Sequence, residues 1–279
     1  MNLKKAGRTS VKILLFLGLW ALLAALLPVP DVQNPALWRF FAELIPLLST
    51  VVLTLVFYRH EKLRISYFLL HNKERGLFLG LVTGLIWLLL PLLLLFFFNQ
   101  MTFTGVHEIE WLGLWFLSAF LNTVMQEFLI RGYIYQLLWD RYNPLAAIII
   151  TSIIFLLLHG GAIEAGLVPA LNVLTMSFLM SALLEYTESI WAPVTAHFIW
   201  NAFGALIFGA VELAADYPQL LETRFAEKKL ICCPDLKLEG SVIVLLMNIF
   251  LTAWIVFFYR REKRAKASHE TKGKEAVAK

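Results

Sequence analysis

The sequence predicts an all-α fold, a polytopic bundle of about eight transmembrane helices with both termini in the cytoplasm. Of its 279 residues, 59% are hydrophobic and 16% are charged, whereas soluble domains usually have about 45–50% and about 25%. Apolar stretches close to the length that crosses a bilayer, about 20 residues, recur almost from end to end. Lys and Arg gather at the ends of these stretches, as membrane topology requires.

The apolar stretches define the expected spans. They cover residues 12–28, 40–58, 76–98, 111–139, 144–160, 168–186, 190–211 and 241–259. Asn143-Pro144 supplies an N-cap and a first-turn proline for the fifth span. No small-residue cleavage site follows the first span, so we expect it to be retained. We therefore divide the chain into N-terminal spans (1–110), a core of spans four to seven (111–211), an outer loop (212–240), a last span (241–259) and a basic tail (260–279).

The orientation follows from the basic residues. With the N-terminus inside, eighteen of the 24 Lys and Arg residues fall in cytoplasmic segments and five in outer ones. This asymmetry places both termini in the cytoplasm. It also accounts for the net charge of +4, so the lipid bilayer is the expected partner and nucleic acid is not. The adjacent Cys232 and Cys233 would form a strained disulfide and are too few for a metal site, so we expect no special role for them.

Ionisable residues inside the expected spans are the strongest functional signal. Each costs roughly 2.5–3.5 kcal/mol on insertion scales. Glu127 and Arg131 lie four residues apart, on one helix face, where they can pair. Taken alone, this pair favours a structural interpretation. Gln126 lies about 100° around the helix from Glu127, so the two side chains can flank one cleft but cannot point the same way.

Two histidines belong to the same pattern. His159 follows an apolar run, and His197 is followed four residues later by Asn201, which stacks an imidazole and an amide on one face. Each His taken alone favours a cap or an interhelical hydrogen bond. Together with Glu127 and Arg131 they indicate one polar cavity. The expected spans, however, place His159 roughly 22 Å and His197 roughly 10 Å from the cytoplasmic side, so the helices must tilt or dip to bring them together.

Such a set can hydrolyse a peptide bond. A carboxylate and an imidazole can hold a water and take its proton, while a second imidazole and an amide bind the developing oxyanion. Glu127, His159 and His197 can instead bind a divalent metal such as zinc, with water as a fourth ligand. The spacing leaves both alternatives open. A transporter is disfavoured because we find no internal repeat.

Three motifs in order carry a family resemblance. Gln126-Glu127-x-x-x-Arg131, Phe155-x-x-x-His159 and His197-x-x-x-Asn201 resemble the motifs of the CAAX prenyl protease and bacteriocin-processing (CPBP or Abi) intramembrane proteases. The resemblance covers roughly residues 111–210. It implies a helical intramembrane endopeptidase in a bacterial or archaeal cell membrane. Its substrate would be a membrane protein or a lipidated peptide, and its catalytic residues Glu127, His159, His197 and Asn201, supported by Arg131.

Gln126 departs from the family pattern. The family has glutamate at this position, and the resemblance implies that this glutamate activates water together with the motif-two histidine. An amide cannot act as a general base. Either Glu127 takes that role with His159, or the chain is an inactive relative that uses the cavity for binding or for bacteriocin immunity.

Overall fold

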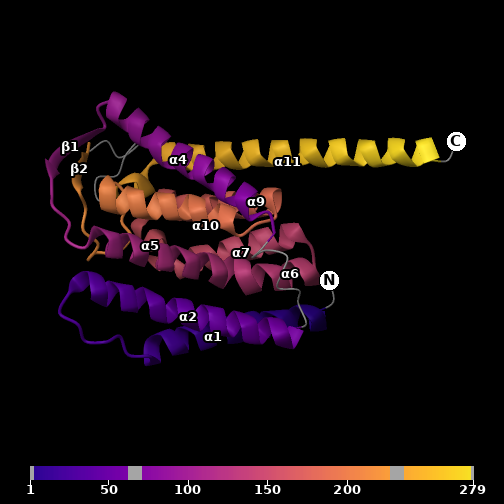
Figure 1. Cartoon of the computed structure of the whole chain (residues 1–279), viewed down its shortest axis with the longest axis horizontal. Helices are drawn as coiled ribbons and strands as arrows, with labels where there is room; N and C mark the ends of the chain where they lie inside the picture. Colours follow the sequence, from indigo (N-terminus) through magenta and orange to yellow (C-terminus); the bar gives the residue numbers. More distant parts are fainter. Residues whose placement is uncertain (1–2, 62–70, 227–235, 278–279) are drawn as a thin grey trace.

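The helices run side by side as one elongated bundle (Figure 1). The computed structural model describes residues 3–61, 71–226 and 236–277, with side chains up to residue 265. The elements are α1 (Leu3–Leu26), α2 (Pro35–Glu61), α4 (Lys73–Phe97), β1 (Met101–Val106), α5 (Leu112–Glu127), η1 (Phe128–Ile134), α6 (Tyr135–Arg141), α7 (Pro144–Leu158), α8 (Gly160–Ala165), α9 (Leu167–Thr187), α10 (Trp191–Phe198), η2 (Ile199–Ile207), β2 (Leu221–Phe225), η4 (Leu238–Gly240) and α11 (Val242–Val277).

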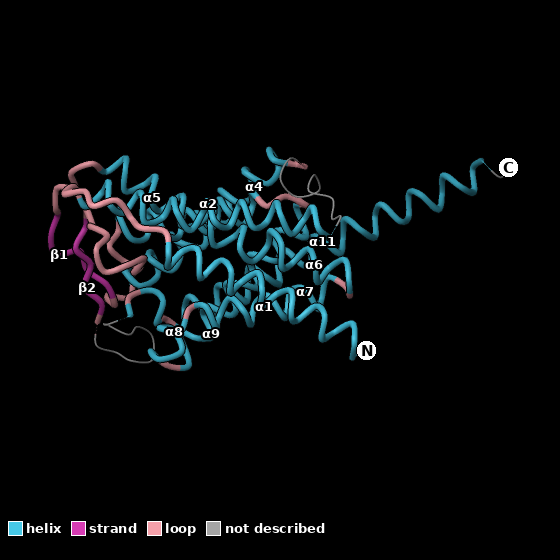
Figure 2. The backbone as a smooth tube through the Cα atoms, turned by 90° about the horizontal axis from the view of Figure 1, so that it is seen from below, coloured by secondary structure: helices cyan, strands magenta, loops and turns pink. Residues whose placement is uncertain are grey.

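All eight stretches expected to span the membrane are helical. In the described part of the chain, six helical segments are long and apolar enough to cross a bilayer, and α7 is a shorter apolar helix. The chain is therefore an integral membrane protein with a helical fold. α1 begins and α11 ends at the same end of the bundle (Figures 1 and 2). The exact number of spans and the side on which the termini lie stay predictions.

A small sheet adds to the predicted all-α fold. β1 and β2 pair antiparallel, with an irregular register between Phe103 and Gly105. They lie at the end of the bundle opposite the start of α1 (Figure 2). β2 lies within the predicted outer loop. The hydrophobic pattern of that segment did not predict a strand. Cys232 and Cys233 lie outside the described residues.

The expected start of the fifth span is confirmed in detail. Asn143 adopts an extended conformation, and its side chain accepts a hydrogen bond from the backbone N–H of Ala146 at 2.8 Å. Pro144 occupies the first turn. Backbone N–H groups there have no acceptor within the helix, so the missing N–H of proline costs no hydrogen bond. These two residues fix where α7 begins. The helix then runs to Leu158, and His159 follows directly after its last residue.

Three glycines let α4 approach α10 closely. Gly76, Gly80 and Gly84 are spaced four residues apart on one face of α4. A Cβ atom added at Gly80 would lie 2.5 Å from the carbonyl oxygen of Ala192, and one at Gly84 would lie 2.9 Å from the Cα atom of Ala196. Small residues at this spacing allow membrane helices to pack backbone against backbone. The stripe thereby sets the position of α10, the helix that carries His197.

The substitution Gly80→Ala tests this contact. An added methyl group has no room beside Ala192 and should destabilise the protein by about 1–3 kcal/mol, the usual effect of overpacking. The matched control is Gly18→Ala in α1, where a Cβ atom would meet nothing within 4 Å. This substitution should leave the stability unchanged or raise it slightly. Thermal unfolding in detergent measures both. Equal melting temperatures for the two variants would contradict the close α4–α10 contact.

Candidate active site

Glu127, the last residue of α5, points into the bundle interior. Its side chain is 0% exposed and that of His197, on α10, is 3% exposed. Glu127 Oε1 lies 2.8 Å from His197 Nδ1. Because a carboxylate oxygen accepts and does not donate, Nδ1 of His197 carries the proton and donates it to Glu127. The carboxylate thus fixes both the orientation and the tautomer of the His197 ring.

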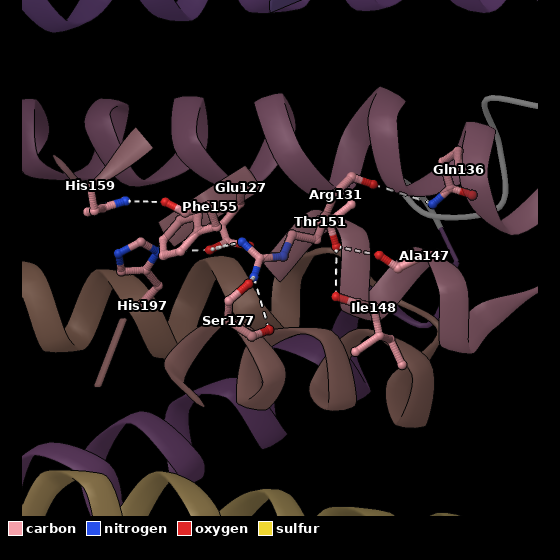
Figure 3. Close-up of polar contacts among 10 residues, drawn as sticks. All are labelled: Glu127, Arg131, Gln136, Ala147, Ile148, Thr151, Phe155, His159, Ser177 and His197. Atoms are coloured by element: carbon pink, nitrogen blue, oxygen red, sulfur yellow. Dashed lines mark hydrogen bonds and ion pairs between the residues drawn. The ribbon is translucent and has the colours of Figure 1, made fainter. Parts of the chain in front are cut away.

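Arg131 neutralises Glu127 from one helical turn further on. Its Nη1 lies 3.4 Å from Glu127 Oε1, and its Nη2 donates to Ser177 on α9, at 3.1 Å to the carbonyl oxygen and 2.5 Å to Oγ (Figure 3). The guanidinium also lies over the Phe155 ring, 4.9 Å from its centroid. The i, i+4 pairing predicted from the sequence is therefore confirmed.

His159 lies in the break between α7 and α8. Its Nδ1 is 2.8 Å from the carbonyl oxygen of Phe155, which can only accept. Nδ1 therefore carries the proton, and Nε2 of the neutral ring has a free lone pair. The His159 ring packs on Phe155 with centroids 4.3 Å apart, and the His197 ring lies 6.3 Å from the same phenyl ring. Both histidines thus converge on Phe155 (Figure 3).

A cavity of about 170 Å³ adjoins this cluster between α1, α5, η1 and α7. The residues that line it are Trp20, Met125, Gln126, Leu129, Ile130, Phe155, Leu158 and His159. The volume holds several waters, since one water occupies about 30 Å³ of liquid. Gln126 faces this cavity while Glu127 faces His197, in agreement with the predicted offset of about 100°. The carboxylate thus lies behind the cavity wall.

Asn201 lies one turn beyond His197, and its Nδ2 donates to Thr123 Oγ1 at 3.3 Å. Thr123 lies one turn before Glu127 on α5, so Asn201 and His197 both contact the α5 face that carries Glu127. The helices that carry these residues widen into π-helix, at η1 directly after Glu127 and at η2 directly after Phe198. Such segments are rare in α-helices and frequent at functional sites.

The described residues do not fit the metal site that we considered. Within residues 3–61, 71–226 and 236–265, no group of three or more His, Cys, Asp or Glu side chains is arranged to hold a metal ion. Glu127 and His197 are instead hydrogen-bonded to each other. We therefore derive no step through a metal.

Two residues of the site were missed in the sequence analysis. Glu43, on α2, is 6% exposed and accepts from Asn122 Nδ2 at 2.8 Å. Asn122 Oδ1 in turn accepts from Gln126 Nε2 at 2.6 Å. The signal for Glu43 was present, because it is a carboxylate inside an expected span, as Glu127 is. Asn122 is uncharged and gave no comparable signal.

The comparisons with known proteins agree with the three-motif resemblance. Residues 108–203 match the family model described as "Type II CAAX prenyl endopeptidase Rce1-like". A curated Bacillus subtilis (strain 168) protein, "Putative membrane peptidase YdiL", is 30% identical over 86 residues. This stretch is 31% of the present chain and spans 33% of that relative. No solved structure matches the chain significantly.

Fold and site together define a class: a polytopic helical membrane protein with a buried Glu–Arg–His cluster beside a small cavity. Within that class, residues 108–203 match the model of the Rce1-like CAAX prenyl endopeptidase family, in agreement with the resemblance of the three motifs. The matched stretch holds every residue of the three motifs. The relative is bacterial, which supports the predicted location in a bacterial membrane.

Proposed function

We propose that the protein is an intramembrane endopeptidase that hydrolyses a peptide bond in a membrane-associated or lipidated protein or peptide. The observation that carries this proposal is a pair of oriented imidazoles, each with Nδ1 held by an oxygen, of which that of His159 lines the cavity. The match of residues 108–203 to a family of endopeptidases supports it. Six of the eight residues that line the cavity are apolar, which suits a substrate that arrives from the lipid phase.

In the proposed reaction, the Nε2 lone pair of His159 takes a proton from a water in the cavity as that water attacks the scissile carbonyl. The protonated His159 then gives this proton to the amide nitrogen as the C–N bond breaks, which releases the amine. Asn201 binds the developing oxyanion with the second hydrogen of its amide. The Glu127 carboxylate holds the His197 ring in place beside Asn201. Glu127 is thus given a positioning role, in place of the water-activating role that we first considered.

Asn201→Leu tests the proposed oxyanion contact. Loss of one such donor lowers kcat by about 10²–10³-fold in proteases, and we expect a loss of this order here. Thr123→Val, which removes the hydroxyl that Asn201 contacts but keeps the amide, should lower kcat much less. The assay uses purified protein in liposomes with lipid-anchored peptides, and mass spectrometry of the fragments. Full activity of Asn201→Leu would remove Asn201 from the site.

A second candidate function is that of a binding or bacteriocin-immunity protein without catalysis. Gln126 favours it, because an amide lines the cavity where a carboxylate would be able to take a proton. The same liposome assay separates the two functions. Absence of fragments from any peptide, with retained peptide binding in wild type and in His159→Ala, would support the binding function and refute the endopeptidase.

A further inference from the structure

A row of three hydrogen-bonded side chains leads from α2 to the cavity. Glu43 Oε2 accepts from Asn122 Nδ2 at 2.8 Å, and Asn122 Oδ1 accepts from Gln126 Nε2 at 2.6 Å. Gln126 lines the cavity, and its Oε1 is buried without a hydrogen-bond partner among the described residues. The row therefore ends in a carbonyl oxygen that is free to accept a hydrogen bond.

The carboxylate at the start determines the direction of the whole row. An ionised carboxylate can only accept, so Asn122 must turn its NH₂ group toward Glu43 and its oxygen toward Gln126. Gln126 must then turn its NH₂ group toward Asn122, which leaves its own oxygen on the far side. The orientation of both amides thus follows from hydrogen-bond chemistry alone.

Arg39 contacts the carboxylate at the start of the row. Its Nη1 lies 3.2 Å from Glu43 Oε1, and its Nε donates to Asp216 Oδ2 at 2.8 Å. Glu43 therefore has a cation on one oxygen and an amide donor on the other, so both oxygens are used as acceptors.

We propose that Glu43, acting through Asn122, is a positioning residue that holds the Gln126 carbonyl oxygen toward the cavity as an acceptor for the attacking water. This inference rests on the proposed function. The water would donate one hydrogen to His159 Nε2 and the other to Gln126 Oε1, which leaves its lone pairs for the scissile carbonyl. Gln126 would orient the water without taking its proton, so an amide at this position is compatible with catalysis.

Because each amide in the row has a fixed orientation, a substitution at position 126 should depend on which residue stands at position 43. In Gln126→Glu, the introduced carboxylate would meet Asn122 Oδ1, acceptor against acceptor, and Glu43 prevents Asn122 from turning round. In the double variant Glu43→Gln/Gln126→Glu, the amide at position 43 can donate to Asn122 Oδ1 after Asn122 turns. Asn122 can then donate to the carboxylate at position 126. The double variant exchanges one carboxylate and one amide without changing net charge.

The deciding experiment is a double-mutant cycle on the melting temperature in detergent, which needs no turnover. Gln126→Glu alone should lower the melting temperature, and adding Glu43→Gln should raise it again by about 2–4 °C, the shift expected from roughly one recovered hydrogen bond. Ser118→Ala is the control, because Ser118 lies on the same helix with its hydroxyl bonded to the carbonyl oxygen of Leu114. If the effects of the two substitutions on the melting temperature simply add, positions 43 and 126 are not coupled and the proposed row is refuted.

A kinetic measurement separates this inference from the proposed function. Glu43→Gln frees the amides to rotate and should lower kcat about tenfold, the equivalent of one hydrogen bond, with little change in KM. Ser118→Ala should retain wild-type kcat. If wild type cleaves and Glu43→Gln cleaves equally fast, the positioning role is refuted. If wild type does not cleave, the proposed function fails, and the melting-temperature cycle still decides whether the row exists.

Discussion

Replacing His159 with alanine should lower kcat for peptide cleavage by about 10²–10⁴-fold, the usual contribution of a general base. The reason lies in the tautomer. The backbone carbonyl oxygen of Phe155 accepts a hydrogen bond from Nδ1–H, so Nε2 is the basic nitrogen of a ring that lines the cavity. No other imidazole in the described residues lines this cavity, so its loss should not be compensated.

The fold should tolerate this change, because His159 lies between two helices and its hydrogen bond to Phe155 is local in sequence. His107→Ala is the matched control, since the His107 side chain is 55% exposed and remote from the site in sequence. It should cleave at the wild-type rate. If His159→Ala retains more than about a tenth of wild-type kcat, His159 is not the base.

Removing the carboxylate of Glu127 should have the largest effect on stability. Glu127→Ala would leave the Arg131 guanidinium, which is 0% exposed, without its counter-charge, and would deprive His197 of its acceptor. Breaking a buried pair from one side destabilises by about 3–5 kcal/mol. Unfolding in detergent, followed by tryptophan fluorescence, measures the difference in the free energy of unfolding.

The double variant Glu127→Met/Arg131→Met is the control for the stability effect. Replacement of both charges by apolar groups is often close to neutral, so the double variant should be more stable than Glu127→Ala. It should also be inactive, because His197 loses the group that orients it. A double variant no more stable than the single one would show that the pair is not what Glu127→Ala disrupts.

The sequence was sufficient to predict the helical membrane fold, because hydrophobic length and the distribution of Lys and Arg are properties of local composition. It also identified residues that the fold brings together, as Glu127 with Arg131 and His197. It did not predict β1 and β2, because two short strands paired across more than 100 residues leave no local signal. The Gly76–Gly80–Gly84 stripe was visible in the sequence, but its partner helix was not.

The sequence identified which residues belong to the site more readily than the role of each residue in it. The 100° offset between Gln126 and Glu127 follows from helix geometry, yet which of the two faces the cavity depends on how α5 packs. The helix lengths suggested different depths for His159 and His197, whereas the structure places both rings against Phe155. The tertiary arrangement of α7 and α10 decides this, and no local pattern encodes it.

The central claim is that the Nε2 atom of His159 activates water in the cavity. Chemical rescue tests it most directly. Imidazole added to His159→Ala in liposomes should restore a measurable part of the cleavage rate, with saturation as it fills the space left by the ring, while wild type and His107→Ala should not respond. If His159→Ala is inactive and imidazole restores nothing although it is shown to bind in the cavity, His159 serves the structure and the account of the mechanism is wrong.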